Sequence, residues 1–244
     1  MNDASPELSV VLPAYEEAQN LDVLLPALHR VLSDLGATYE ILVVDAQAPR
    51  DATPDICATH NVRYVARTGG AFYGHAIRSA QLAARGRYVI LMDADGSHGP
   101  TFIPKLWEYR DQAGIVVASR YVRGGHTENP AILIFMSLTV NYIFRIFLGL
   151  RCADVSNSFR LYQGDEFRGL NLSCDHFDIV EEILIKLYFS RKNYVIKEVP
   201  FTFEKRKAGK TKRKLLAFAI GYGFTLIRLR RLKASMRKPR SSSS

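Results

Sequence analysis

Two aspartates one residue apart follow a short apolar run in the first half of the chain. Asp93 and Asp95 come directly after residues 89–92, which are all apolar. Strand residues point to alternate faces, so this spacing leaves both carboxylates on one side of the strand's end. Adjacent carboxylates repel each other, and a divalent cation with oxygen ligands relieves the repulsion and can also hold a diphosphate. The pair predicts a metal site, with capping of a helix that begins near Thr101 as the alternative.

Alternating strands and helices are expected around this pair. Apolar runs predict strands over residues 8–12, 41–44, 62–66, 88–92 and 115–119, and helical spacing predicts helices over 20–35 and 74–84. Such alternation indicates an α/β fold, with a mostly parallel sheet and helices on both faces. Ligands of these folds bind at the carboxyl ends of the strands. Residues 13–17, Asp45, Asp93 with Asp95, and Ser119 with Arg120 end the predicted strands.

The second half of the chain combines apolar segments with basic ones. Residues 131–150 are strongly apolar, but Asn141 and Arg145 interrupt them, which makes a poor bilayer-spanning helix. A buried core helix and a helix in the membrane interface both remain open for this segment. Residues 215–232 join an apolar stretch to a basic end that suits anionic lipid headgroups. A helix over 177–189, a strand over 194–203 and a basic loop over 205–214 are also predicted.

Composition limits the classes of protein that fit this chain. Its 244 residues, 48% of them hydrophobic, suffice for one large α/β domain or two small ones. The net charge of +9 indicates an acidic partner: a phosphate, a nucleic acid or an anionic membrane. Three widely spaced cysteines predict neither a disulfide framework nor a zinc site, and favour a reducing compartment. Residues 1–7 are polar and short, unlike a secretory signal, so a cytoplasmic protein is expected.

A series of short motifs runs in order from about residue 8 to residue 212. The motifs are residues 10–21, Asp45, Gly74 to Ala76, Asp93 with Asp95, Ser119 to Tyr121 followed by Gly124 and Gly125, residues 154–160, Glu182, Glu198 to Pro200, Phe203, Arg206, Gly209, Thr211 and Lys212. Together they resemble the family 2 glycosyltransferases of the GT-A fold. Within that family the chain is most similar to the dolichol-phosphate mannose synthases and related polyprenyl-phosphate glycosyltransferases.

Four positions depart from the family pattern. Ala46 stands where a second aspartate is usual, and Ser97 replaces a glutamine after the acid pair. Leu133 stands where an arginine often follows a proline, and Ser158 replaces a glycine. These changes bear on the donor base, the metal ligands and one contact with the acceptor phosphate.

The resemblance implies an inverting glycosyltransferase that moves a sugar from a nucleotide-sugar to a polyprenyl or dolichyl phosphate. Mannose and GDP-mannose are the expected sugar and donor, and a UDP-sugar donor or a catalytically impaired scaffold protein are the alternatives. Transfer to a sugar hydroxyl, as in polysaccharide synthases, is disfavoured because the late QxxRW element is missing and the only tryptophan is Trp107. The acceptor phosphate has a second pKa of about 6, so it attacks without needing a general base.

The resemblance also implies roles for individual residues on the donor side. Asp93, Asp95 and Ser97 are expected to hold Mg²⁺ or Mn²⁺. The basic loop over residues 205–214 is expected to close over the donor diphosphate, with Arg206 and Lys212 as its phosphate ligands. Contacts with the nucleotide-sugar are expected from Pro13, Tyr15, Glu17, Asp45, Gly74, Asp93, Ala94, Arg206 and Lys212.

On the acceptor side, Arg120, Ser137 and Arg160 are the candidates for binding the phosphate. The alternative for the two arginines is a salt bridge to Asp154 or Glu182. Residues expected to take part in catalysis are Asp95, Arg120, Arg160 and Arg206.

The expected organisation has three parts. A GT-A domain over residues 1–212 is followed by an amphipathic basic helix in the membrane interface over 213–238 and a disordered tail over 239–244. The basic helix predicts peripheral binding to an anionic membrane surface, on its cytoplasmic face. A membrane-anchoring subunit is a further candidate partner. Nucleic acid is not expected, because no basic face carries interleaved aromatic residues.

Overall fold

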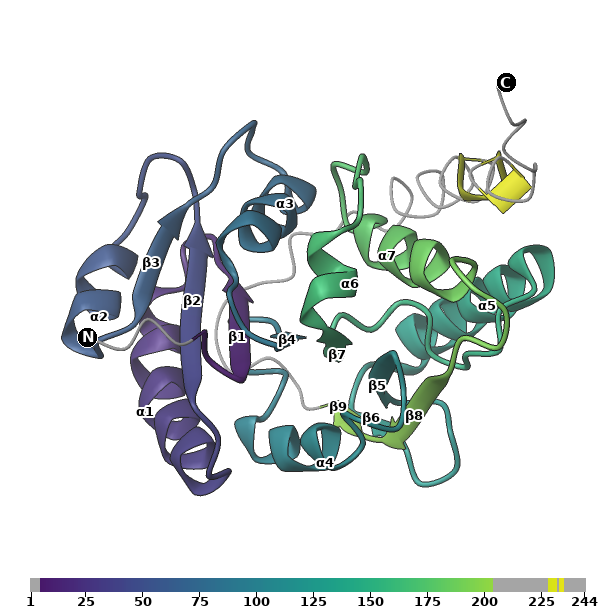
Figure 1. The fold of residues 1–244 in the computed structure, drawn as a ribbon, viewed down its shortest axis with the longest axis horizontal. Coiled ribbons are helices and arrows are strands. Elements are labelled where there is room, and N and C mark those ends of the chain that lie inside the picture. The colour runs from purple at the N-terminus through teal and green to yellow at the C-terminus, as the bar shows by residue number, and fades with distance from the viewer. Residues whose placement is uncertain (1–4, 204–227, 232, 235–244) are drawn as a thin grey trace.

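A twisted central sheet organises the molecule in the computed structural model, which describes residues 5–203, 228–231 and 233–234 (Figure 1). In this part of the chain, seven strands pair in the order β3-β2-β1-β4-β7-β5-β8. All neighbours are parallel except β7, which is antiparallel to both β4 and β5. The strands are β1 Leu8–Pro13, β2 Tyr39–Asp45, β3 Arg63–Ala66, β4 Tyr88–Leu91, β5 Ile115–Ser119, β7 Arg160–Gln163 and β8 Ile196–Pro200.

Helices cover both faces of this sheet, which confirms the predicted α/β architecture (Figure 1). One face packs against α1 (Ala18–Asp34), α2 (Thr53–Thr59), the short 3₁₀ turn η1 (Pro100–Phe102) and α4 (Ile103–Glu108). The other face packs against α3 (Tyr73–Ala83), α6 (Gly164–Arg168), α7 (Ile179–Tyr188) and the inner side of α5 (Ala131–Leu148).

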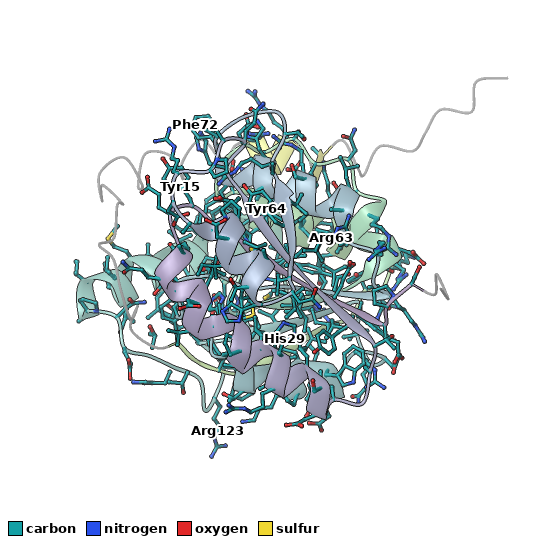
Figure 2. The ribbon with its side chains drawn as sticks, turned by 90° about the vertical axis from the view of Figure 1, so that its left-hand side faces the viewer. Tyr15, His29, Arg63, Tyr64, Phe72 and Arg123 are labelled. Carbon is teal, nitrogen blue, oxygen red and sulfur yellow. The ribbon has the colours of Figure 1, made fainter. Side chains whose placement is uncertain are left out.

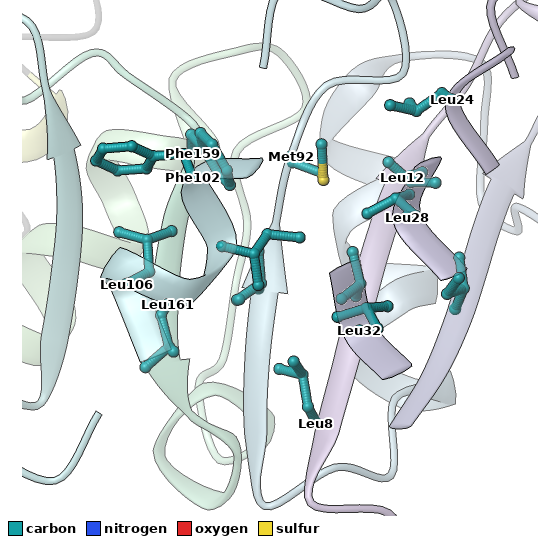
Figure 3. Packing of buried hydrophobic residues seen from close by; sticks show 14 of the residues in the cluster. Leu8, Leu12, Leu24, Leu28, Leu32, Met92, Phe102, Leu106, Phe159 and Leu161 are labelled. Atoms are coloured by element: carbon teal, nitrogen blue, oxygen red, sulfur yellow. The ribbon is translucent and has the colours of Figure 1, made fainter. Parts of the chain in front are cut away.

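The core follows from the two periodicities in the sequence. Leu8 and Leu12 of β1 point toward α1, whereas Val11 points to the opposite face, as alternation along a strand requires. The inner side of α1 carries leucines three and four residues apart, and Figure 3 shows Leu28 and Leu32 directed at the sheet. This packing fixes β1, β2 and β4 side by side, so that their carboxyl ends form one edge.

The segment over residues 194–203, which was expected to form one strand, forms two. β8 ends at Pro200, and β9 (Thr202–Phe203) pairs with β6 (His126–Thr127) in a separate two-stranded sheet. β8 is the last strand of the sheet and its ladder with β5 ends at Pro200, which has no N–H group to donate. Phe201 instead donates its N–H to the carbonyl of Ser119, and this bond turns the chain across the end of β5.

Helix α5 exposes most of its apolar surface. Only Asn141, Phe144 and Leu148 of this helix are buried. Among the described residues it is the one helix with the length and apolar composition to cross a bilayer, and 17% of it is buried. That property alone is weak support for a span, since core helices can share it. The low burial nevertheless rules out the core-helix interpretation for most of α5.

The predicted basic helix over residues 213–238 lies largely outside the described residues, as does the predicted tail over 239–244. Residues 228–231 and 233–234 are helical. Leu229 is fully buried in the same cluster as α5 and α7. The Lys233 ammonium donates to the Leu148 carbonyl at 2.5 Å. A positive charge is stabilising at this position because the carboxyl end of a helix carries partial negative charge. These residues therefore pack against the globular part of the protein.

Candidate active site

The acid pair lies in the loop that follows β4, at the carboxyl edge of the sheet. Ser158 donates its hydroxyl to Oδ1 of Asp93 at 3.0 Å. Oδ1 of Asp95 accepts from the backbone N–H of Ser97 at 3.0 Å and from its hydroxyl at 2.5 Å. Hydroxyl and backbone N–H donors therefore orient both carboxylates.

His98 contacts the backbone of this loop from the interior of the protein. Its ring is completely buried and stacks on Phe159, with 4.8 Å between the ring centroids. Nδ1 accepts the backbone N–H of Asp93 at 2.9 Å, which places the ring hydrogen on Nε2, 3.9 Å from Oδ2 of Asp93. Burial lowers the pKa of His98, and the charges of Asp93 and Asp95 oppose that shift only in part. A neutral His98 does not offset the two carboxylates.

The residues present fit a hard divalent cation that completes its shell with substrate. Mg²⁺ is usually held by one or two carboxylates together with phosphate oxygens and water. Asp93 and Asp95 supply two carboxylates, and no cluster of three or more His, Cys, Asp or Glu side chains suited to a metal occurs within the described part of the chain. Ser97, predicted as a further ligand, is 1% exposed and holds Asp95 in this arrangement. Its metal contact stays a prediction.

Asp45 and Arg67 join the ends of the first three strands. Asp45 ends β2, is 1% exposed, and has Oδ2 3.5 Å from the Tyr64 hydroxyl. Burial raises the pKa of Asp45. Arg67, just after β3, donates to the carbonyls of Asp45 at 3.0 Å and Ala14 at 2.7 Å. The one signal for Arg67 in the sequence is its position directly after the strand predicted over residues 62–66.

Tyr15 presents an aromatic ring at the end of β1. It is 37% exposed, and the guanidinium groups of Arg50 and Arg67 lie 5.5 and 5.8 Å from its ring centroid. Figure 2 shows Tyr15 and Phe72 toward the same end of the molecule. Arg67 is buried, whereas Arg50 is exposed beside the ring. An exposed cation next to an exposed ring suits an anionic, aromatic ligand such as a nucleotide.

Other predicted donor residues lie nearby with contacts of their own. Pro13 is the last residue of β1 and is half-buried, and Ala94 is buried in the core between the two aspartates. Glu17 precedes α1 and accepts a hydrogen bond from Asn20 at 2.5 Å. The predicted nucleotide contacts of these residues are neither required nor opposed by this geometry.

Gly74 allows α3 to approach the loop over residues 171–178. A Cβ atom at this position would lie 2.2 Å from the carbonyl oxygen of Cys174. The Gly74 N–H donates to the Asp175 carbonyl at 2.7 Å, and Arg78 donates to the Asp175 carboxylate at the same distance. The close packing of α3 against this loop therefore explains why residue 74 is a glycine. The predicted contact of Gly74 with the donor stays a prediction.

Glu182 fixes the other side of that loop. Its buried carboxylate accepts the N–H groups of Ser173 and Cys174 and pairs with the Lys186 ammonium at 2.7 Å. Burial acts to raise its pKa, but the hydrogen bonds from Lys186, Cys174 and Ser173 outweigh burial and lower it.

We expect Glu182→Gln to destabilise the protein by about 1–3 kcal/mol at pH 7, because buried N–H groups lose a charged acceptor. A lowered pKa in the folded state means that this contribution is present above the ordinary value of 4.5 and is lost as the pH falls through the lowered value. Urea unfolding at pH 7 and pH 4 measures it, and the gap between variant and wild type should shrink at the lower pH. Asp165→Asn, at a carboxylate that is 99% exposed, is the control. An equal gap at both pH values would contradict this account.

Arg120 is held by Asp154, as the alternative interpretation expected. Nε and Nη2 of Arg120 each donate to the Asp154 carboxylate at 2.7 Å, and Nη2 also donates to Ser156 at 3.0 Å. Asp154 is completely buried, and its N–H donates to Glu198 at 3.0 Å. The guanidinium lies 5.6 Å from the centroid of the Phe203 ring. Its plane is thus fixed at the carboxyl end of β5, close to the edge that carries the acid pair.

Arg160 does not fit its predicted role at the acceptor phosphate. It lies in β7, between β4 and β5, and is 0% exposed. Its guanidinium donates to the carbonyls of Val155 at 2.6 Å and Val180 at 3.0 Å. These bonds to carbonyl groups also replace the alternative that was predicted for Arg160, a salt bridge to Asp154 or Glu182. A phosphate cannot reach this side chain without displacing α7 or the loop after α5, so Arg160 is removed from the candidate site.

The remaining predicted residues divide by location. Ser137 lies within α5 and is half-buried. Arg206 and Lys212, with the whole basic loop over 205–214, lie outside the described residues. The catalytic and donor-binding roles of these two residues stay predictions.

Comparison with known proteins places this geometry in a family. Residues 9–166 match the family described as glycosyl transferase family 2. A dolichol-phosphate mannosyltransferase of Pyrococcus furiosus is 32% identical over 216 residues, which cover 85% of this chain and 59% of that protein. This chain thus spans little more than half the length of that relative. An undecaprenyl-phosphate mannosyltransferase of Micrococcus luteus is 31% identical over 221 residues, 83% of this chain and 85% of that protein.

Solved structures with the same fold are more distant in sequence. Glucosyl-3-phosphoglycerate synthase from Mycobacterium tuberculosis, in complex with Mn²⁺, UDP and glucosyl-3-phosphoglycerate, has a TM-score of 0.69 at 16% identity and covers 97% of this chain and 82% of its own. The complex of that enzyme with Mn²⁺, UDP-glucose and phosphoglyceric acid has a TM-score of 0.72 at 16% identity. This match covers 92% of the present chain and 80% of the enzyme's chain. These likenesses confirm the predicted GT-A fold. The family match spans the acid pair and the turn after β5, and with relatives 31% and 32% identical over most of the sequence, this chain belongs to glycosyl transferase family 2.

Proposed function

We propose that this protein transfers a sugar from a nucleotide-sugar to a polyprenyl phosphate, with inversion at the transferred carbon. The observation that carries the proposal is the oriented pair Asp93 and Asp95 on the sheet edge that also holds Arg120. The two relatives named as polyprenyl-phosphate mannosyltransferases support this acceptor class and favour mannose. GDP-mannose is the donor that we propose.

On the donor side, the chain binds and orients two charged groups. Asp93 and Asp95 hold Mg²⁺ or Mn²⁺, which when bound offsets the charge that grows on the leaving nucleoside diphosphate. Structural neighbours solved with Mn²⁺ or Mg²⁺ support this choice of metal. Tyr15 and Asp45 face the nucleoside, and Arg67 ties the loops that carry them.

On the acceptor side, the phosphate needs placement more than activation. A phosphate oxygen forms the new bond to the anomeric carbon while the bond from that carbon to the diphosphate breaks, and the electron pair leaves with the diphosphate. Because the phosphate is mostly dianionic at pH 7, no proton has to be removed. Arg120, whose plane Asp154 fixes, binds this phosphate and offsets its repulsion with the donor diphosphate.

A donor screen tests the proposal. The protein is incubated with a polyprenyl phosphate, Mn²⁺ and one of GDP-mannose, UDP-glucose or UDP-N-acetylglucosamine, and both released nucleoside diphosphate and glycolipid are measured. Of the three donors, we expect GDP-mannose to give product and the two UDP-sugars to give none. Product from a UDP-sugar would favour the alternative suggested by the UDP complexes of the structural neighbours. Nucleotide binding without any product would indicate the scaffold alternative and overturn the proposal.

Arg120→Lys tests the assignment at the acceptor. Lysine keeps the charge but cannot bind Asp154 through two nitrogen atoms and also donate to the phosphate. The KM for polyprenyl phosphate should therefore rise about tenfold while the KM for the donor stays unchanged. Arg123→Lys, at an exposed arginine of the same turn, is the matched control. An unchanged acceptor KM in Arg120→Lys would remove Arg120 from the acceptor site.

Membrane contact comes from the exposed side of α5. Its apolar residues Ile132, Phe135, Leu138, Tyr142, Ile146 and Phe147, here called the α5 face, are 45–67% exposed. Exposed Arg145 and Arg151 lie at its carboxyl end, and Arg230 lies over the Phe147 ring at 6.0 Å. A broad apolar face with adjacent cations matches an anionic bilayer surface. The protein binds there peripherally, on the cytoplasmic face, and a membrane-anchoring subunit is the other candidate occupant of the α5 face.

A further inference from the structure

One amide is buried on the inner side of the otherwise apolar α5. Asn141 is 2% exposed and shares this side with Phe144 and Leu148. A buried amide opposes folding unless its polar atoms are hydrogen-bonded. Oδ1 of Asn141 accepts the N–H of Val155 at 3.1 Å, while Nδ2 is buried without a hydrogen-bond partner among the described residues. Packing alone does not account for an amide at this position, so the bond to Val155 is the property to explain.

Buried side chains hold both backbone polar groups of Val155. Asn141 takes its N–H from the side of α5, and Nη2 of Arg160 donates to its carbonyl at 2.6 Å from the side of β7. Arg160 is itself fixed by the Val180 carbonyl and has no exposed surface. The peptide at Val155 is therefore held between a helix and a strand.

This clamp on Val155 determines where the preceding residue lies. Asp154 is completely buried, and its carboxylate binds Nε and Nη2 of Arg120 at 2.7 Å each and the backbone N–H of Arg120 at 2.9 Å. A shift of Val155 would move Asp154, and Arg120 would follow because its side chain and its backbone are both bound. The contacts thus run without interruption from Asn141 to Arg120.

We propose that Asn141 is a positioning residue that couples α5 to the phosphate-binding guanidinium of Arg120 through Val155 and Asp154. The proposal rests on the proposed function, in which Arg120 binds the acceptor phosphate. The same helix presents the α5 face on its outer side, so the element that meets the lipid also fixes the arginine that receives the lipid's phosphate. Asn141 touches neither substrate.

Asn141→Leu tests the coupling, because leucine fits the apolar surroundings and removes the bond to Val155. With a short-chain, water-soluble polyprenyl phosphate, membrane binding does not enter the measurement. The KM for this acceptor should rise about five- to tenfold and the KM for the donor should stay unchanged, while thermal stability should fall because the buried N–H of Val155 loses its acceptor. Asn141→Ala, which removes the amide and introduces no new side-chain atoms, should give the same split and serves if the leucine variant folds poorly.

Phe144→Leu is the matched control. Phe144 is 1% exposed on the same side of α5, so this variant loses packing while the bond to Val155 stays. It should lower thermal stability and leave the acceptor KM unchanged. A rise of the acceptor KM in Phe144→Leu as large as that in Asn141→Leu would show a general structural effect and overturn the proposal.

Combining Asn141→Leu with Arg120→Lys separates this inference from the proposed function. If Asn141 acts through Arg120, the double variant should have the acceptor KM of Arg120→Lys alone. Independent effects that multiply would overturn the coupling, as would an unchanged KM in both Asn141 variants while Arg120→Lys shows its defect. If Arg120→Lys itself leaves the acceptor KM unchanged, the assignment of Arg120 fails and the coupling fails with it.

Discussion

Replacing Asp95 by alanine is expected to lower the rate of sugar transfer by on the order of a hundredfold or more. The reaction gathers negative charge on the departing diphosphate, and losing one such electrostatic contact typically has an effect of this size. The variant keeps only Asp93 of the two carboxylates that hold the divalent cation. Product formation per minute at saturating donor and acceptor is the measurement.

Metal removal should give the same result by a second route. EDTA should abolish transfer by the wild type, and added Mg²⁺ or Mn²⁺ should restore it, whereas Asp95→Ala should recover little in excess metal. Asp165→Asn removes a carboxylate that is 99% exposed and remote from the loop after β4, so it should keep wild-type activity. Full activity in EDTA, or in the folded Asp95→Ala variant, would exclude the metal-dependent mechanism.

The sheet edge that carries the acid pair could be predicted from the chain alone. Runs of apolar residues identify β1, β2 and β4, and the rule that ligands meet the carboxyl ends of parallel strands then brings Asp45 and Asp93 to one edge. β7 escaped prediction because it has only four residues and one is the buried Arg160. An arginine in a short strand carries no local signal of burial.

The same limit explains why one of the two predicted acceptor arginines lies at the site and the other does not. Both belong to family motifs, and sequence spacing cannot distinguish a side chain on the edge of the sheet from one in its interior. Arg120 comes after β5 and lies at the edge, whereas Arg160 lies inside the sheet and binds carbonyl groups. Arg67 shows the opposite case, since its contacts with Asp45 and Ala14 join segments far apart in the chain. Such contacts depend on tertiary packing.

Removing apolar residues from the α5 face is expected to detach the protein from anionic liposomes. Phe135 and Ile146 are 67% and 59% exposed on this face, and replacing both by serine removes about 3 kcal/mol of apolar burial in the lipid interface. The partition coefficient should therefore fall about a hundredfold. Sedimentation with liposomes of increasing anionic lipid content measures it, and high salt should weaken binding of the wild type because Arg145 and Arg151 are exposed.

A matched control uses apolar residues that are exposed elsewhere. Val23 in α1 and Leu82 in α3 are 70% and 84% exposed, so Val23→Ser combined with Leu82→Ser loses comparable apolar surface away from α5. This control should sediment like the wild type. The variant of the α5 face should lose activity on long polyprenyl phosphates in vesicles, yet keep activity on a short, water-soluble acceptor and keep its nucleotide affinity.

Truncation after Leu226 is a second expected route to weaker liposome binding, but it changes more than the membrane contact. It would also remove Leu229, which is completely buried, and Lys233, which binds the carbonyl at the end of α5. The serine variant of the α5 face leaves those contacts intact, so it reports on the lipid surface alone. If that variant still sediments as the wild type does while the truncated chain does not, the basic carboxyl-terminal segment is the anchor. The α5 face would then be the surface for a membrane-anchoring subunit, because lipid would no longer account for its exposed apolar side chains.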